Sequence, residues 1–325
     1  MDKQRKINLF IKKILRNYRI CNKVAHKIMK QYISIPHILL LLLISVNTTY
    51  AADKPQVFVS IIPQKFFVQQ IGKDLIDVKV MVQPGASPAT YEPKPMQMVD
   101  LSVSKLYFSI GVPFEKRWLK KIAASNPDMK IIHTDKGISK IRMSSHSHDH
   151  ETHEESGDHR SEDEGLDPHI WLSPKLVQIQ AKIILNALKQ IDPENQSIYQ
   201  KNFDQFSVEL KQTDAQLTRL FTHKTKTQFL VFHPSWGYFA TDYGLEQIPV
   251  EIEGKDPKPS QLKEIVDLAK KNNIRVIFVQ PQNSTRSARI IAKEIKGNIV
   301  FADPLAFDWF ANMNTIAQKM LEALK

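Results

Sequence analysis

Short runs of β-branched and aromatic residues alternate with amphipathic stretches along most of this 325-residue chain. Runs of this length between polar turns predict strands, and their alternation with helical patterns predicts βα units around parallel sheets. The predicted strands are 57–61, 78–82, 106–110 and 130–133, then 229–232, 248–252, 276–279 and 299–301. We therefore expect an α/β fold of two lobes, each a mostly parallel four-stranded sheet with flanking helices.

The region between the two sets of strands, residues 174–220, carries apolar side chains at helical spacing. It is interrupted once, where Asp192 can cap and Pro193 can open a second helix. A long helix joining the lobes is expected. Because open α/β sheets bind ligands outside the carboxyl ends of their strands, the site should lie in the cleft between the lobes. The predicted domains are a leader (1–51), a first lobe (52–191), a linking helix (192–225) and a second lobe (226–325).

The leader contains one apolar run, residues 38–46, which is too short for a membrane-spanning helix of about 20 residues. With small residues at Thr49 and Ala51, the run indicates a signal peptide cleaved after Ala51 or Ala52, and hence export to the periplasm. The alternative is a membrane anchor. Counting from Met29 gives a signal of ordinary length, so we hypothesise that translation starts there.

The formal net charge of +11 is concentrated in the leader. Its first 30 residues hold ten Lys and Arg side chains against one Asp, a net +9, which leaves +2 for the rest of the chain. A nucleic-acid partner is therefore not indicated. The only cysteine, Cys21, would leave with the signal peptide, so the mature protein has neither a disulfide nor a thiolate ligand.

Residues 144–165 contain no large apolar side chain and cannot bury enough surface to offset the entropy of ordering. We expect a mobile surface loop. Five of the 11 histidines interleave with acidic residues here: His146, His148, His150, His153 and His159. Imidazoles and carboxylates both bind divalent metals, so the composition predicts an auxiliary, metal-collecting loop. The alternative is a solvated acidic loop in which the histidines are incidental.

Three further residues of ligand type fall at predicted lobe edges. His169 precedes the first middle helix, while His233 and Asp303 each follow a predicted strand of the second lobe. Two imidazoles and a carboxylate suit zinc and neighbouring transition metals better than calcium or magnesium, which prefer oxygen ligands. Taken singly, a histidine beside Pro and Trp or an aspartate before Pro is more often structural.

Several segments in order resemble the metal-binding proteins of zinc and manganese ABC importers, the family called cluster 9 or cluster A-I. The resemblance spans residues 56–324 and rests on Pro-Gly-Ala-Ser-Pro (84–88), Tyr-Glu-Pro (91–93), Asp-Pro-His-Ile-Trp-Leu-Ser-Pro (167–174), Asp-Pro-Glu-Asn (192–195), the stretch 233–245 and Asp-Pro-Leu (303–305). A His-rich loop before the Asp-Pro-His motif is typical of the zinc-binding branch.

The resemblance implies two lobes bridged by a rigid long helix, with metal held between them by His169, His233 and Asp303. Zn²⁺ is preferred because the manganese branch usually has Glu where His233 stands, although Mn²⁺ or another divalent metal remains an alternative. The implied function is to deliver metal to an ABC permease driven by a separate ATPase chain, since this chain has no Walker-type phosphate loop. We expect a monomer without enzymatic activity.

One position departs from the family pattern. Members typically carry a histidine in Ser-Pro-His-x-Tyr, where this chain has Ala89. A methyl group cannot bind metal, so water, a loop histidine or another side chain must complete the coordination. Glu115 and Glu92 are possible substitutes, and either is otherwise a solvated surface residue. We expect weaker zinc binding than in four-ligand relatives.

Two other functions remain open at this point. Three protein ligands with an open fourth position is also the arrangement of catalytic zinc, which would make the protein a hydrolase. The sequence has no His-Glu-x-x-His motif to support that reading. A periplasmic zinc buffer or chaperone, acting through residues 144–165 with a degenerate cleft, is the other alternative.

Overall fold

The structure is a computed structural model that describes residues 2–32, 54–144, 165–224, 226–252, 254–283 and 285–324. The chain divides into two units, Met1–Asp53 and Lys54–Lys325. In the first unit, α1 (Asp2–Tyr32) is a 31-residue helix. The apolar run 38–46 and the proposed cleavage site lie outside the described residues. Of the helices within the described ranges, none combines the length and the apolar character that crossing a membrane requires.

The second unit holds two parallel sheets of four strands each. The first has the order β2-β1-β3-β4 and the second β6-β5-β7-β8. The strands are β1 (Gln56–Val59), β2 (Asp77–Val80), β3 (Leu106–Ser109), β4 (Lys130–His133), β5 (Gln228–Val231), β6 (Glu246–Pro249), β7 (Val276–Val279) and β8 (Asn298–Phe301). Each predicted strand overlaps one of these, and the predicted α/β fold class is confirmed.

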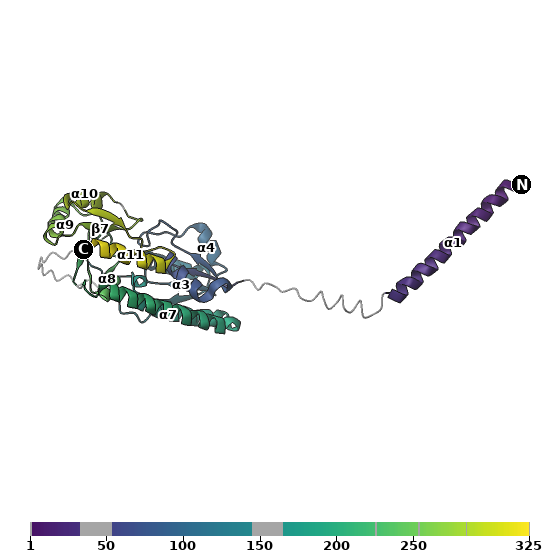
Figure 1. Ribbon diagram of the computed structural model, residues 1–325, viewed down its shortest axis with the longest axis horizontal. Coiled ribbons are helices and arrows are strands. Elements are labelled where there is room, and N and C mark those ends of the chain that lie inside the picture. Colours follow the sequence, from purple (N-terminus) through teal and green to yellow (C-terminus); the bar gives the residue numbers. More distant parts are fainter. Residues whose placement is uncertain are drawn as a thin grey trace. The chain divides into compact units, whose positions relative to one another are not determined.

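Helices flank both sheets (Figure 1). They are α3 (Ile62–Gly72), α4 (Pro95–Leu101), α5 (Pro113–Ser125), α6 (Pro174–Ile191), α7 (Gln196–Phe221), α8 (Gly237–Tyr243), α9 (Pro259–Lys271), α10 (Arg286–Glu294) and α11 (Trp309–Ala323). Single 3₁₀ turns are η1 (Lys73–Leu75), η2 (Ile170–Leu172) and η3 (Pro193–Asn195). Proline opens α4, α5, α6 and α9, where its missing N–H would have had no partner within the helix.

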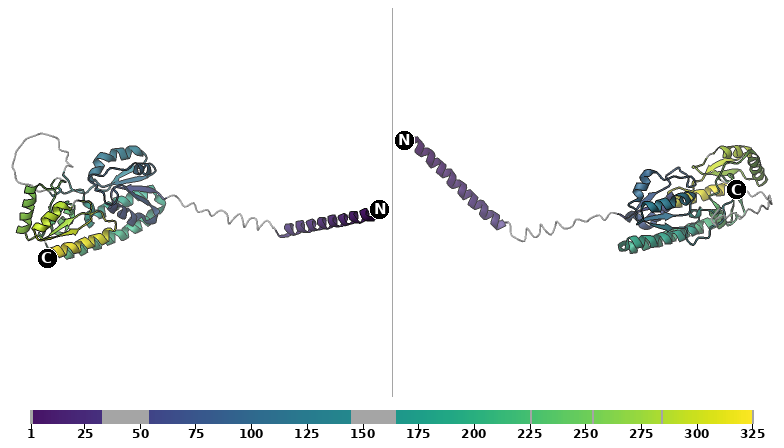
Figure 2. Two further views of the ribbon diagram at one scale, coloured as in Figure 1. Left: turned by 90° about the horizontal axis from the view of Figure 1, so that it is seen from above. Right: turned by 180° about the vertical axis from the view of Figure 1, so that it is seen from behind.

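The middle region folds as predicted into two helices, α6 and α7, separated at Asp192 and Pro193. The 26-residue α7 runs along both lobes (Figures 1 and 2). A second element also joins the lobes, because Trp309 and Phe310 of α11 pack edge-on against Phe67 and Phe206 of α3 and α7. The lobes are thus held by α11 as well as by the predicted long helix.

The core is organised by the two faces of the second sheet. In β5, Phe229 and Val231 belong to the large hydrophobic cluster that also contains the first sheet, α6, α7 and α11. Their neighbours Leu230 and Phe232 belong to a separate cluster with α9 and α10. This alternation follows from the two-residue period of a strand. It leaves the carboxyl ends of the strands as the free edge on which a site can be built.

Candidate metal centre

The three predicted ligands lie on connections that follow strands. His169 belongs to the long connection after β4 and directly precedes η2. Ser173 fixes the end of this segment, since its hydroxyl accepts a hydrogen bond from the Leu176 amide at the start of α6. His233 and Asp303 each stand two residues after a strand, β5 and β8 respectively. All three connections approach one cavity.

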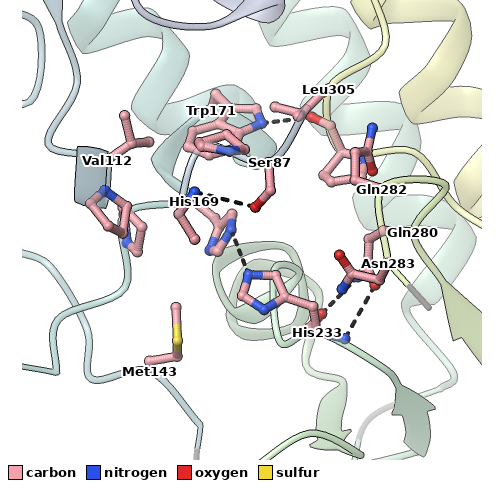
Figure 3. A pocket seen from close by; sticks show the side chains of 15 residues that line it. Ser87, Val112, Met143, His169, Trp171, His233, Gln280, Gln282, Asn283 and Leu305 are labelled. Atoms are coloured by element: carbon pink, nitrogen blue, oxygen red, sulfur yellow. Dashed lines mark hydrogen bonds between the residues drawn. The ribbon is translucent and has the colours of Figure 1, made fainter. Parts of the chain in front are cut away.

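The two histidines meet tip to tip. The Nε2 atoms of His169 and His233 are 3.3 Å apart, and the ring centroids are 5.1 Å apart at an interplanar angle of 69°. Figure 3 shows the two imidazoles, which both line the cavity, facing each other. Residues 64 positions apart in the sequence are therefore brought within the reach of one metal ion.

A carboxylate stands behind each imidazole. Nδ1 of His169 lies 2.7 Å from Oδ1 of Asp167, and Nδ1 of His233 lies 2.6 Å from Oε1 of Glu251. Asp167 is fully buried and Glu251 is 9% exposed. Both rings are therefore oriented on one edge by an acidic partner while the other edge faces the second ring.

The two imidazoles differ in their access to solvent. The His169 side chain is 8% exposed and that of His233 is 26% exposed. Burial lowers the pKa of His169 below its ordinary value of 6.5, and this outweighs the opposing effect of Asp167. A neutral imidazole is the form that binds metal, so burial holds His169 in the binding form at neutral pH.

The cavity in front of the histidines is small and largely apolar. It has a volume of about 60 Å³, whereas pockets for organic ligands typically measure about 300–1,000 Å³. Besides His169 and His233 it is lined by Ser87, Pro88, Ala89, Val112, Pro113, Met143, Pro168, Trp171, Gln280, Gln282, Asn283, Pro304 and Leu305. An ion with one or two waters fits this space better than an organic substrate does.

Asp303 is held next to the cavity wall rather than in it. Its Oδ1 accepts hydrogen bonds from Gln282 Nε2 at 2.8 Å and from the Leu305 amide at 2.9 Å. Within the described ranges, no three His, Cys, Asp or Glu side chains are grouped closely enough to form a metal site. The structure thus brings His169 and His233 together and places Asp303 one side chain away, beside Gln282.

The two glutamates weighed as substitutes for the missing histidine lie elsewhere. Glu115 is buried and accepts hydrogen bonds from the Ser60 hydroxyl and from the amides of Ile110 (3.0 Å) and Gly111 (2.8 Å). Burial raises its pKa to about 7. Glu92 is exposed. Neither is among the residues that line the cavity, whereas Ala89 is.

Three site residues had not been identified from the sequence: Asp167, Glu251 and Gln280. Gln280 follows β7 and holds the His233 backbone, donating to its carbonyl oxygen (2.7 Å) and accepting from its amide (3.1 Å). Asp167 carried a local signal, the Asp-x-His spacing. For Glu251 the signal was its position: Glu251 stands two residues after β6 and His233 stands two residues after β5, and these two strands pair in parallel. The five loop histidines lie outside the described residues.

Comparisons with a family model, with known sequences and with solved structures all match this chain to zinc-uptake proteins. The family described as "Zinc-uptake complex component A periplasmic" matches residues 57–323. The chain is 29% identical to the "High-affinity zinc uptake system protein ZnuA" of Bacillus subtilis (strain 168) over 247 residues, covering 75% of this chain and 76% of that protein. A solved structure described as "Crystal structure of ZnuA" is 41% identical with a TM-score of 0.77, covering 84% of this chain and 100% of that one. A "138-173 ZnuA deletion mutant plus zinc bound" is 40% identical with a TM-score of 0.75, covering 84% and 99%.

Proposed function

Since the chain belongs to the family of periplasmic zinc-uptake complex component A proteins, we propose that it captures Zn²⁺ in the periplasm and delivers it to an ABC-type permease. The similarity to a zinc-uptake protein and to a zinc-bound structure supports zinc as the cargo. A separate ATPase chain would drive transport, and the receptor would act as a monomer. Export would use the signal peptide within the leader, residues 1–51, with the lobes and linking helix bounded as the sequence predicts.

The observation that carries the proposal is the separation of the two Nε2 atoms, 3.3 Å. Two nitrogen ligands of a tetrahedral zinc ion, each bonded at 2.0–2.1 Å, stand about 3.3 to 3.4 Å apart. His169 and His233 therefore already have the spacing of two zinc ligands. Mn²⁺ and other divalent metals remain alternatives, but paired imidazoles favour zinc over metals that prefer oxygen.

Asp303 is the third proposed ligand, through the carboxylate oxygen that Gln282 and Leu305 leave available. Water can fill the position opposite Ala89, because the cavity is open to water-sized molecules there. Of the two glutamates weighed as additional ligands, Glu115 would first have to give up its bonds to two backbone amides. Three protein ligands and a water are enough for a transported ion, which must later be released.

A hydrolase is the weaker proposal. A catalytic zinc needs a base that can reach the metal-bound water. The carboxylates of Asp167 and Glu251 are instead turned to the Nδ1 atoms of the ligand histidines. We propose a binding protein rather than an enzyme on these grounds.

A zinc buffer acting through residues 144–165 is the competing function, favoured by the five histidines of that segment. Calorimetric titration with Zn²⁺ of the parent and of a variant lacking 144–165 separates the two. Importer delivery requires that one tight site per chain survives the deletion. Loss of all tight binding on deletion would instead favour the buffer. An anomalous edge scan on metal-bound crystals would then identify the metal and its ligands.

A further inference from the structure

The hydrogen-bonding edges of the two imidazoles decide which ring nitrogen is free to bind metal. A carboxylate can only accept a hydrogen bond, so the Nδ1 atoms facing Asp167 and Glu251 must each carry the hydrogen. A neutral imidazole has one ring hydrogen, which leaves Nε2 of each ring bare. The two bare nitrogens are the pair that lies 3.3 Å apart. Their lone pairs converge on the same small space.

The carboxylates are held in place by the fold, independently of any metal. Oδ1 of Asp167 also accepts from the His169 backbone amide at 2.9 Å, which fixes its position relative to the ring. On its other side Asp167 lies against Gly237, where an added Cβ would come within 2.7 Å of Oδ2. Only glycine at that position leaves room for the carboxylate.

Glu251 is positioned from a different strand. β5 and β6 pair in parallel with Val231 opposite Pro249, so the same register places His233 level with Glu251 two residues later. The Glu251 amide donates to the Phe232 carbonyl at 3.0 Å, which continues the pairing past the end of the strands. The carboxylate that orients His233 is therefore supplied by strand pairing, whereas the one that orients His169 is supplied by its own loop.

We propose, on the basis of the proposed zinc-binding function, that Asp167 and Glu251 are positioning residues that hold both imidazoles in the tautomer with Nε2 free for the metal. Each also increases the electron-donating power of its ring by accepting the Nδ1 hydrogen. Neither touches the metal. The two nitrogen lone pairs are therefore already at the spacing of tetrahedral zinc ligands in the metal-free protein.

Glu251 is the better residue to test, because the loop around Asp167 is packed into the core. Glu251→Ala removes the acceptor, whereas Glu251→Gln keeps an oxygen that can accept from Nδ1 and is close in shape. Glu246→Gln is the matched control: it removes the same charge at an exposed position of β6, the strand that precedes Glu251, where the carboxylate contacts Gln228. Circular dichroism of each variant confirms that it folds.

Two measurements are made on each protein. Calorimetry with Zn²⁺ should give a loss of about 10- to 100-fold for Glu251→Ala, the range seen when a ligand histidine loses its partner, with a smaller loss for Glu251→Gln. Nitrogen-15 NMR of the metal-free proteins at about pH 8, where imidazoles are neutral, reports which ring nitrogen of His233 carries the hydrogen. The hydrogen should sit on Nδ1 in the parent and in Glu246→Gln, and move toward Nε2 in Glu251→Ala.

The inference is overturned if Glu251→Ala binds zinc within about twofold of the parent, well short of the loss expected for a ligand partner. It is equally overturned if affinity falls while the His233 hydrogen stays on Nδ1, because the loss would then have another cause. A parent protein that fails to bind zinc, or a His233→Ala variant that binds as tightly as the parent, would overturn the proposed function itself. The two failures are therefore distinguishable.

Discussion

The two sheets share one strand order but use the carboxyl ends of their strands differently. In the second sheet every strand is followed, within two residues, by a polar side chain of the site: His233, Glu251, Gln280 and Asp303. In the first sheet, the connections that follow β2 and β3 contribute Ser87 and then apolar residues to the cavity: Pro88, Ala89, Val112 and Pro113. The same topology thus forms an edge of candidate ligands in the second sheet, whereas the connections after β2 and β3 of the first sheet form an apolar wall.

The first lobe does have polar residues at these strand ends, but they bond with one another inside the lobe. Ser60, which follows β1, shares its hydroxyl with Tyr107 (2.8 Å) and donates to Glu115. Gln64 of α3 donates to the hydroxyl of Thr134, which follows β4, at 3.1 Å. Ser60, Gln64 and Thr134 are all fully buried. A buried network in which each member has a partner stabilises a fold and leaves little free to bind a ligand.

The difference shows that topology alone does not place the chemistry. Parallel βα units provide an edge where ligands can bind, and the residues just after each strand decide whether that edge binds anything. Here the strand ends of the second sheet supply most of the candidate metal-binding groups, and the connections after β2 and β3 close the cavity. His169 comes from the connection between the lobes, so that the site is completed only when both lobes are in place.

The largest expected effect comes from removing a ligand on the second lobe. His233→Ala should lower zinc affinity on the order of 1,000-fold, about 4 kcal/mol, because losing a direct ligand costs more than losing its hydrogen-bond partner. Calorimetry measures the change. His223→Ala, at an exposed histidine after α7, is the matched control and should bind as the parent does. Zinc binding by His233→Ala at the parent's affinity would remove the second lobe from the site.

Much of the fold could be predicted because its signals are local. The strands are short runs of β-branched and aromatic residues between polar turns, and all eight were found from that pattern, with ends displaced by at most three residues. The packing of α11 on the first lobe was missed because it depends on Trp309 and Phe310 meeting rings more than 100 positions earlier. Nothing in the sequence near those residues indicates which surface they cover.

In the candidate site, too, the residues with local sequence signals could be predicted and those that depend on tertiary contacts could not. His169, His233 and Asp303 could be proposed as ligands from the sequence because each stands in a short motif beside a strand or helix end. Of their carboxylate partners, Asp167 had a local signal in its Asp-x-His spacing, whereas Glu251 reaches His233 only through the parallel pairing of β5 and β6. The orientation of Glu115 was equally hidden: its position after β3 suggests a cavity, yet two backbone amides turn its carboxylate inward. Side-chain direction depends on tertiary contacts that spacing does not encode.

The second prediction tests whether the Glu115 carboxylate serves the fold. Burial raises its pKa from 4.5 to about 7, so the folded protein holds this proton more tightly than the unfolded chain. The contribution of Glu115 to the free energy of unfolding should therefore fall as pH rises from about 4.5 to about 7, by at most about 3 kcal/mol. Urea unfolding of the metal-free protein at both ends of this window measures the change.

Glu115→Gln provides the control for that measurement. It removes the titrating group and should remove this part of the pH dependence, while zinc affinity stays within about twofold of the parent because the side chain does not line the cavity. A tenfold or greater loss of zinc affinity in Glu115→Gln would show that this carboxylate does reach the metal. The contrast between the two lobes would then be wrong.

The third prediction would add a ligand to the apolar wall formed by the connections after β2 and β3. Ala89 lines the cavity, and its loop is fixed by the Ala89 amide donating to the Ser87 hydroxyl (3.3 Å) and by the Pro88 carbonyl accepting from Phe114 (3.1 Å). Ala89→His should therefore tighten zinc binding about tenfold, or about 1.4 kcal/mol. Ala89→Leu fills similar space without a donor atom and should not. Unchanged or weaker binding by Ala89→His would mean that position 89 does not face the metal.

The smallest expected effect is the change in secondary structure when acid releases the metal. If the two hydrophobic clusters maintain the structure without the metal, acid should release zinc without unfolding the protein. Protons compete with metal for imidazole nitrogen, so affinity should fall between about pH 7 and pH 5. The lowered pKa of His169 places its part of this competition below 6.5.

Two linked titrations explain why the fold should survive this change. A histidine whose pKa is lowered by burial stabilises the fold above its unfolded value of 6.5, and that stability is lost as pH falls below 6.5. Glu115 acts in the opposite sense, since protonating it between about 7 and 4.5 restores stability. The two contributions therefore act in opposite directions over the window in which metal leaves. Zinc release, followed with a chromophoric chelator, should therefore be complete while far-ultraviolet circular dichroism is unchanged, and helical signal lost in step with the metal would instead identify zinc as part of the structure.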